Sequence, residues 1–248
     1  MISAQCISEI ISKKTRTLVL GGMAVIIHGL NRSTKDLDIW TDPKQWATAI
    51  EDVLQSHSQI TAVYLDDTTC KWEPASKGQI AQISAKGRVL RLLGCDRPLD
   101  IFYKPNEVEL EEFDKFWDRG IKLDDGSRVL DAVDLIITKQ LTDRPHDRTD
   151  IAFLESKIEK LLFERLPVES YEYAAAQFAR FRSADTAYIA TTNSDPKVKG
   201  LGLNILCELA QEGDPFAKEH LETIRLNDVE GARKELRNST HSPEIGDH

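Results

Sequence analysis

Apolar and polar residues alternate along the first half of the chain in patterns typical of short helices and strands. Residues 2–13 carry apolar side chains at helical spacing and predict an amphipathic helix. Short apolar runs bounded by glycine, proline and polar residues predict strands, and Gly87 lies where two of them would form a hairpin. The predicted strands are 18–20, the segment with Asp36 and Asp38, 62–65, 79–85, 88–93 and 99–103, and further helices are predicted at 23–28 and 43–55.

The second half of the chain has the longer periodicity of helices and no predicted strand. A helix is predicted at 131–141, and Pro145 is placed to open another at its first turn. Further helices are predicted at 157–163, 168–181, 198–211 and 215–224. We therefore expect an α/β (α+β) fold with a mixed sheet flanked by helices at residues 1–155, an all-helical region at 156–237 and a polar, disordered tail at 238–248.

Two aspartates, Asp36 and Asp38, stand two residues apart on a predicted strand. Their side chains leave one face of the strand, whereas the apolar residues between and after them leave the other face and enter the core. The turn Gly21-Gly22 opens the helix that precedes this strand. Two hard oxygen ligands beside such a turn suit a triphosphate held by Mg²⁺. Two solvated acids on a strand edge, and a tight turn without a ligand, are the alternatives.

Composition places the chain among ordinary soluble globular proteins. It is 41% hydrophobic and 29% charged, and its net charge of −9 argues against a protein that coats nucleic acid non-specifically. No apolar run approaches the roughly 20 residues that span a bilayer, and the N-terminus lacks a signal-peptide pattern. We expect a cytoplasmic protein without membrane contact and without a zinc site, and reduced, mostly buried thiols at the scattered Cys6, Cys70, Cys95 and Cys207.

The glycines and aspartates together carry a resemblance to a known superfamily. Gly-Gly, a gap of thirteen residues and then Asp-hydrophobic-Asp-hydrophobic is similar to the signature of the DNA polymerase β-like nucleotidyltransferases. The fuller string GGMAVIIHG, followed by Arg32, Thr34 and DLDIW, resembles the minimal bacterial nucleotidyltransferases, which include the AbiEii-type toxins. The resemblance covers residues 15–155 and implies the mixed sheet of the nucleotidyltransferase fold.

The superfamily takes a third carboxylate from a later strand, and Asp100 in PLDIFY (Pro98–Tyr103) matches that position. Asp96 is the competitor, but it lies in a turn. The resemblance implies that Asp36, Asp38 and Asp100 are catalytic and bind Mg²⁺ or Mn²⁺, the first two at the ion on the nucleotide side and Asp100 at a second ion. Two such ions would stabilise the attacking and leaving oxygens at the α-phosphate of an NTP such as ATP or GTP.

The same resemblance implies the nucleotide contacts. Gly21 and Gly22 would let the backbone approach the β- and γ-phosphates, and no serine hydroxyl stands here, although members of the superfamily often have Gly-Ser. The resemblance implies that Thr34 also contacts the nucleotide. Arg32 either clamps a phosphate or pins its loop to a carboxylate, and the sequence leaves both open. We expect His28 to be a packed helix residue and not a catalyst.

A second group of charged residues follows the core. Lys139, Arg144, Asp147 and Asp150 are similar in spacing to a Lys…Arg…Lys-Asp-x-x-Asp pattern of AbiEii-like domains. In those domains the lysine reaches the triphosphate, and a downstream aspartate orients it or the base. His146 replaces the second lysine of the pattern, which leaves Asp147 without an assigned role. We expect Lys139 and Asp150 to contact the nucleotide, and a surface salt-bridge network is the alternative.

These expectations define one function and one alternative. The function is that of a metal-dependent enzyme that moves an NMP from an NTP to an acceptor hydroxyl on an RNA, a protein or a small molecule. The resemblance to AbiEii-type toxins extends it to the toxin of a toxin–antitoxin or abortive-infection system, with an antitoxin protein as partner. The alternative is a catalytically inactive module on the same fold that senses nucleotide or binds a partner. The base, the acceptor and the oligomeric state are not specified by the sequence.

Overall fold

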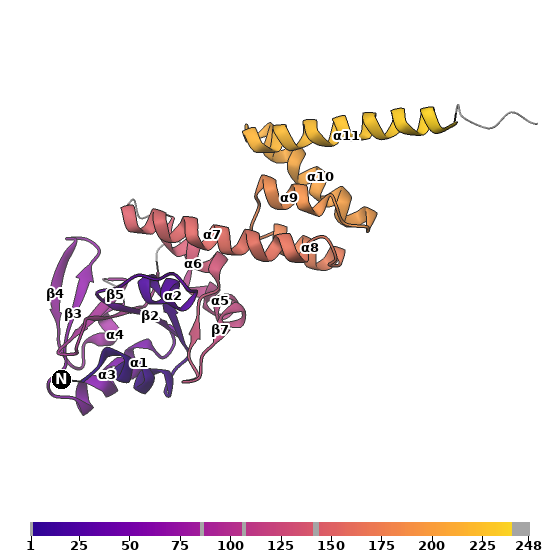
Figure 1. The fold of residues 1–248 in the computed structure, drawn as a ribbon. Helices are drawn as coiled ribbons and strands as arrows, with labels where there is room; N and C mark the ends of the chain where they lie inside the picture. The colour runs from indigo at the N-terminus through magenta and orange to yellow at the C-terminus, as the bar shows by residue number, and fades with distance from the viewer. Residues whose placement is uncertain (1, 85–86, 106–107, 141–143, 240–248) are drawn as a thin grey trace, which may run out of the picture. The chain divides into compact units, whose positions relative to one another are not determined.

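The chain divides into two compact units, Met1–Ser156 and Lys157–His248. The computed structural model describes residues 2–84, 87–105, 108–140 and 144–239, and for 229–239 the backbone alone. The first unit holds an eight-stranded mixed sheet flanked by helices, and the second is helical (Figure 1). The predicted fold class is therefore confirmed. Within the described residues, no helix has both the length and the apolar character needed to cross a membrane.

The sheet of the first unit has the strand order β4-β3-β5-β6-β2-β1-β8-β7. The pairs β2–β6 and β1–β8 are parallel, and the other neighbouring strands are antiparallel. The parallel pair at the centre places two strands side by side that are far apart in the sequence. The strands are β1 Thr17–Leu20, β2 Leu37–Thr41, β3 Thr61–Asp66, β4 Lys71–Ala75, β5 Val89–Leu93, β6 Leu99–Phe102, β7 Ile121–Lys122 and β8 Arg128–Val129.

Helices lie on both faces of this sheet. α3 packs on α1 and on α4 below the sheet in the view of Figure 1, and α2 and α6 pack on each other above it. On β2, Leu37 and Ile39 are buried, whereas Asp36, which immediately precedes the strand, and Asp38 are partly exposed. The predicted alternation is thus present. The helices of this unit are α1 Ala4–Ser12, α2 Gly21–Ile27, α3 Trp46–Ser56, α4 Ile80–Ile83, η1 Leu110–Glu112, α5 Phe113–Arg119 and α6 Ala132–Lys139.

The hairpin predicted around Gly87 is wrong. Residues 80–83 of the predicted strand 79–85 form the helix α4, because Ile80 and Ile83 are spaced by three and both are buried on one helix face. The hairpin is made instead by β3 and β4, and β4 was not predicted. Pro74 lies in β4 and argues against a central strand, but β4 is the edge of the sheet, where proline is tolerated.

Two smaller expectations also differ from the structure. The helix predicted at 43–55 begins only at Trp46, because the Asp42 carboxylate pairs with Arg16 and accepts from the Lys44 N–H instead of opening the helix. The cysteines are not mostly buried. All four are free cysteines. Cys6, Cys70 and Cys207 are exposed, and Cys95 is partly exposed.

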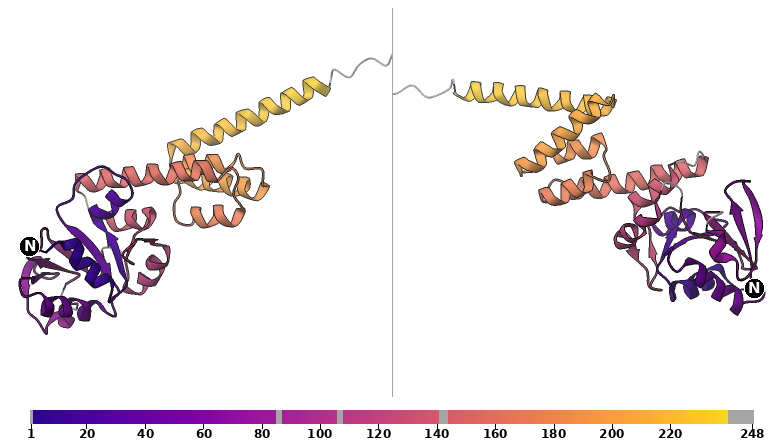
Figure 2. Two further views of the ribbon diagram at one scale, coloured as in Figure 1. Left: turned by 60° about the horizontal axis from the view of Figure 1, so that its bottom comes forward. Right: turned by 180° about the vertical axis from the view of Figure 1, so that it is seen from behind.

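The second unit consists of helices that begin at side-chain caps or at proline. Ser170, Ser183 and Asp195 each accept a hydrogen bond from the first turn of the helix that follows. α9 was not predicted, and the segment predicted at 157–163 is the end of α7, which starts in the first unit. The helices are α7 Pro145–Arg165, α8 Tyr171–Phe178, α9 Ala184–Ala190, α10 Pro196–Gln211 and α11 Pro215–Ser239 (Figure 2). α11 therefore includes the first two residues of the tail expected at 238–248, and the rest of that tail lies outside the described residues.

Two glycines of α10 allow a matched test of packing in this unit. A Cβ at Gly202 would stand 2.6 Å from the Ala187 carbonyl oxygen of α9, whereas one at Gly200 would meet nothing within 4 Å. We expect Gly202→Ala to lower the free energy of unfolding by about 1–3 kcal/mol, because the backbone of α9 must shift. Gly200→Ala should raise it by up to about 1 kcal/mol through helix propensity. Thermal unfolding followed by circular dichroism compares them, and equal shifts would contradict the close approach of the two helices.

Candidate functional site

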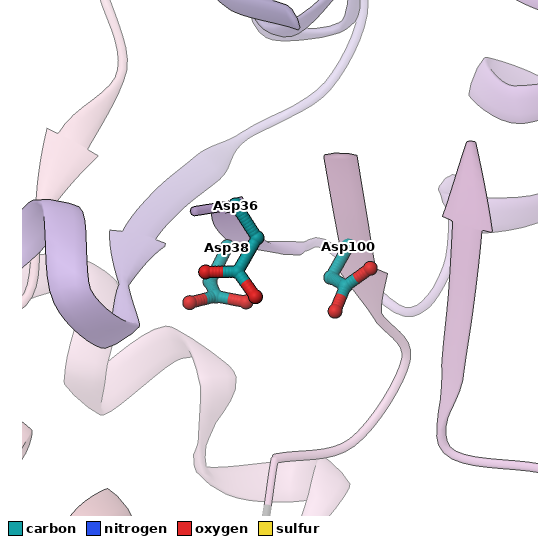
Figure 3. A group of neighbouring side chains, drawn as sticks. All are labelled: Asp36, Asp38 and Asp100. Carbon is teal, nitrogen blue, oxygen red and sulfur yellow. The ribbon is translucent and has the colours of Figure 1, made fainter. Parts of the chain in front are cut away.

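Three aspartates converge at the centre of the sheet. Asp38 of β2 lies directly opposite Asp100 of β6 in the parallel pair, and Asp36 immediately precedes β2. One carboxylate oxygen from each of the three lies within 4.8 Å of the others (Figure 3). Asp96, the competitor for the third position, accepts a hydrogen bond from the Ala4 backbone N–H at 2.7 Å, and it is not in this group.

Like charge and burial raise the pKa of Asp38 to about 7. Burial has the largest effect, followed by the nearby carboxylates of Asp36 and Asp100. The positive charge of Lys139 and a hydrogen bond from the Gly22 N–H act in the opposite direction. Clustered carboxylates of this kind repel one another unless protons or cations neutralise them. Their oxygens are the ligands that Mg²⁺ prefers, so the three side chains fit a divalent cation.

Arg91 holds the third carboxylate and was not predicted from the sequence. Its Nε and Nη2 donate to the two oxygens of Asp100 at 2.6 and 2.7 Å across the β5–β6 pair. The carboxylate raises the pKa of the Arg91 guanidinium. The sequence does carry one signal for this residue, because a single charge interrupts the apolar strand β5, Val89–Leu93.

Gly21 and Gly22 are the first residues of α2, not a turn before it as predicted. Gly21 has a φ of +62°, and a Cβ there would stand 1.8 Å from Oδ2 of Asp38. A Cβ at Gly22 would stand 2.6 Å from the Thr34 hydroxyl and 2.9 Å from Nη2 of Arg32. Both positions therefore require glycine because predicted site residues lie directly against the backbone.

The charged residues after the core form a buried network instead of a surface one. Lys139 Nζ donates to Asp147 and to Asp150, both at 2.8 Å, and Arg32 Nη2 donates to Asp150 at 2.7 Å. Asp147 also accepts from Arg144. Of the two roles considered for Arg32, the structure shows the contact with a carboxylate, and a contact with phosphate stays a prediction.

The aspartates open into a cavity of about 500 Å³. Asp150 is fully buried and is not among the residues that line it, so its predicted contact with a nucleotide stays a prediction. His28 is buried away from this cavity, with Nε2 at 2.8 Å from the Leu130 carbonyl oxygen, as expected of a packed residue. The lining residues include Gly21, Gly22, Arg32, Thr34, Asp36, Asp38, Arg91, Asp100, Phe102, Lys139, Arg144 and Asp147.

The comparisons with known proteins place the chain in a family. Residues 3–166 match the model of a family described as "Nucleotidyltransferase of unknown function (DUF6036)", and the chain belongs to that family. A search of curated proteins finds no match. Among solved structures, the chain is similar to one described as "putative nucleotidyltransferase from H. pylori", at 15% identity and a TM-score of 0.37 over 90% of this chain and 95% of that one. The assignment rests on the family and not on this structural likeness.

Proposed function

We propose that this protein is a Mg²⁺-dependent nucleotidyltransferase that moves an NMP from an NTP to an acceptor hydroxyl. The observation that carries the proposal is the convergence of Asp36, Asp38 and Asp100 in one cavity of the first unit. In this reaction the acceptor oxygen bonds to the α-phosphorus of the NTP. The bond from that phosphorus to the β-phosphate oxygen breaks, pyrophosphate leaves, and the hydroxyl proton passes to water.

The three aspartates have different places in this reaction. Asp36 and Asp38 would hold the cation shared with the triphosphate, and Asp100 would complete a second cation site beside the acceptor. Mg²⁺ or Mn²⁺ would supply charge neutralisation at the attacking and leaving oxygens when bound. Thr34 donates to the Asp36 carboxylate at 3.1 Å and keeps it turned toward its partners. Asp100, between Asp38 and Arg91, lies where it can favour loss of the acceptor proton.

Cationic side chains of the cavity would hold the triphosphate. Lys139 and Arg32 both line the cavity and both bind the buried Asp150, which fixes their positions. We assign phosphate contacts to these two cations and to the backbone at Gly21 and Gly22. Asp150 would then act through Lys139 and Arg32, because its fully buried carboxylate pairs with both cations.

Isothermal titration with ATP or GTP and Mg²⁺ tests the site. We expect the wild-type protein to bind and Asp36→Ala/Asp38→Ala to lose at least about 100-fold in affinity, because both ligands of the nucleotide-side cation are removed. Asp124→Ala is the matched control, since Asp124 is an exposed acid outside the cavity. Equal binding by the double variant and the control would end the assignment.

One observation favours a second function, a module that binds nucleotide without turnover. Arg91 already engages both oxygens of Asp100, the residue that a second cation would need. Incubation with labelled NTPs and a cell lysate separates the two functions. Label transferred to RNA or protein supports the enzyme, whereas tight binding with no transfer supports the sensor.

The finer biological role follows from the resemblance of the Gly-Gly and Asp-x-Asp motifs to AbiEii-type toxins. We propose that the protein acts as the toxin of a toxin–antitoxin or abortive-infection pair, neutralised by a separate antitoxin protein. This role requires that expression arrest growth and that Asp36→Ala/Asp38→Ala relieve the arrest. Growth that is unaffected by the active protein would exclude it and leave the proposed chemistry intact.

A further inference from the structure

An exposed tryptophan is connected to the aspartate cluster through Arg91. The Arg91 guanidinium lies over the Trp72 ring, 4.6 Å from its centroid, while its Nε and Nη2 bind Asp100. Within the described part of the chain, Nη1 of Arg91 has no hydrogen-bond partner, and Arg91 lines the cavity. Trp72 is 42% exposed although it is a large apolar side chain. Asp100, Arg91 and Trp72 therefore form a continuous path from the cavity to the surface of the β3–β4 hairpin.

The sheet register explains why these residues meet. Asp100 is directly opposite Arg91, Arg91 is opposite Val63, and Val63 is opposite Pro74, so these side chains share one face of the sheet. Trp72 stands two residues from Pro74 on β4 and faces the same way. On this face the strands β5, β3 and β4 present a surface that continues from the aspartate cluster.

That surface is apolar and open, with one cation beside the acids. Leu93 of β5 lies two residues from Arg91 on the same face and is 37% exposed. Pro74 is exposed as well, and Val63 is partly exposed. Isolated apolar residues at a protein surface are ordinary, whereas a group of them on one face is typical of surfaces that bind a ligand or partner. We name Trp72, Pro74, Val63, Leu93 and Arg91 the hairpin face.

We propose that the hairpin face binds the acceptor and that the acceptor is the 3′ end of a single-stranded nucleic acid. This inference rests on the proposed function. A base stacks on Trp72, a backbone phosphate accepts from Nη1 of Arg91, and the terminal 3′-hydroxyl lies beside Asp100. The 3′ oxygen bonds to the α-phosphorus of the NTP, pyrophosphate leaves, and the proton passes to water. The chain is thereby extended by one nucleotide.

The chemistry of the hairpin face favours this acceptor over a protein side chain. Stacking on an aromatic ring holds a base whatever its identity, and a guanidinium beside the ring adds a phosphate contact. A tyrosine or serine in a protein would offer no phosphate to Arg91. The net charge of −9 fits a single cationic contact at the site and not a protein that coats nucleic acid.

Tryptophan fluorescence gives a direct test because Trp72 is the most exposed of the four tryptophans. Trp40 and Trp46 are almost fully buried, and Trp117 is partly exposed. Titration with a short RNA or DNA oligonucleotide carrying a free 3′-hydroxyl, without NTP, is expected to quench the fluorescence. Trp72→Phe should abolish the quenching and keep the affinity, measured by anisotropy of a labelled oligonucleotide. Trp72→Ala should weaken that affinity at least about fivefold.

The controls separate this inference from the proposed function. Phe216→Ala removes an even more exposed aromatic from the helical unit and should leave oligonucleotide binding unchanged. Titration with ATP and Mg²⁺ should give the same affinity for Trp72→Ala and the wild-type protein. Oligonucleotide affinity that is unchanged in Trp72→Ala would overturn the inference, and so would Trp72-dependent binding of a tyrosine-containing peptide in place of the oligonucleotides. Either result would leave the nucleotide site standing, whereas loss of ATP binding in the wild-type protein would reject the proposed function itself.

Discussion

Replacement of Asp38 by asparagine is expected to remove activity and, in the absence of metal, to stabilise the protein. Nucleotidyl transfer should fall by more than about 100-fold, because Asp38 is a ligand of the proposed cation. The metal-free protein should gain about 2 kcal/mol in free energy of unfolding. This is about half of the free energy that the rise in the pKa of Asp38 corresponds to. This gain corresponds to a rise in melting temperature of about 5 °C.

The raised pKa of Asp38 determines how the stability of the metal-free protein depends on pH. In the folded protein the pKa of Asp38 is raised from 3.8 to about 7, so between these values the folded state keeps a proton that the unfolded state has released. The stabilising contribution of protonated Asp38 is complete below pH 4 and is lost as the pH rises through about 7. Asp38→Asn has no such group and should not lose this contribution.

Differential scanning calorimetry in EDTA between pH 4 and pH 8 measures this effect. The gap in melting temperature between Asp38→Asn and the wild-type protein should open as the pH rises and level off above about pH 7. Mg²⁺ should then stabilise the wild-type protein and have little effect on the variant. Asp124→Asn is the control for loss of an exposed acid. A variant that is less stable than the wild type at pH 8 would contradict the repulsion among the three carboxylates.

The central part of the fold could be predicted because its signals are local. β2 alternates over its first three residues, with Leu37 and Ile39 buried and Asp38 partly exposed, and a register error of one residue would exchange the faces of the acid and its apolar neighbours. Asp100 stands in an apolar strand, and its position opposite Asp38 follows once β2 and β6 pair in parallel. The sequence shows the two strands, but only the fold shows that they are neighbours.

The edge of the sheet and the network behind the site could not be predicted. β4 contains Pro74 and has no buried residue, so its pattern does not differ from that of a loop. Asp150 and Lys139 look like surface charges on helices, but both are buried, and Lys139 Nζ pairs with Oδ2 of Asp150. The ion pair of Arg91 with Asp100 could not be predicted either, because the two residues lie on different strands and meet only through the register of β5 and β6.

Gly21→Ala is expected to disable the site without unfolding the protein. The new Cβ would stand 1.8 Å from Oδ2, 2.6 Å from Cγ and 2.9 Å from Cβ of Asp38, so the carboxylate must move away from Asp36 and Asp100. Binding of ATP with Mg²⁺ should weaken at least about tenfold, because metal sites depend on ligand position. The positive φ of Gly21 adds a backbone cost of about 1–2 kcal/mol that any alanine at such a φ shares.

Gly78→Ala isolates the effect of the contact from that of the backbone. Gly78 has a φ of +79°, and a Cβ there would meet nothing within 4 Å. Both variants should lose similar stability in thermal unfolding, since the displaced Asp38 side chain can turn toward the cavity it lines. Only Gly21→Ala should lose Mg²⁺-dependent nucleotide binding. If both variants bind ATP as the wild type does, the position of Asp38 in the fold does not matter to the ligand, and the assignment of this carboxylate to the cation fails.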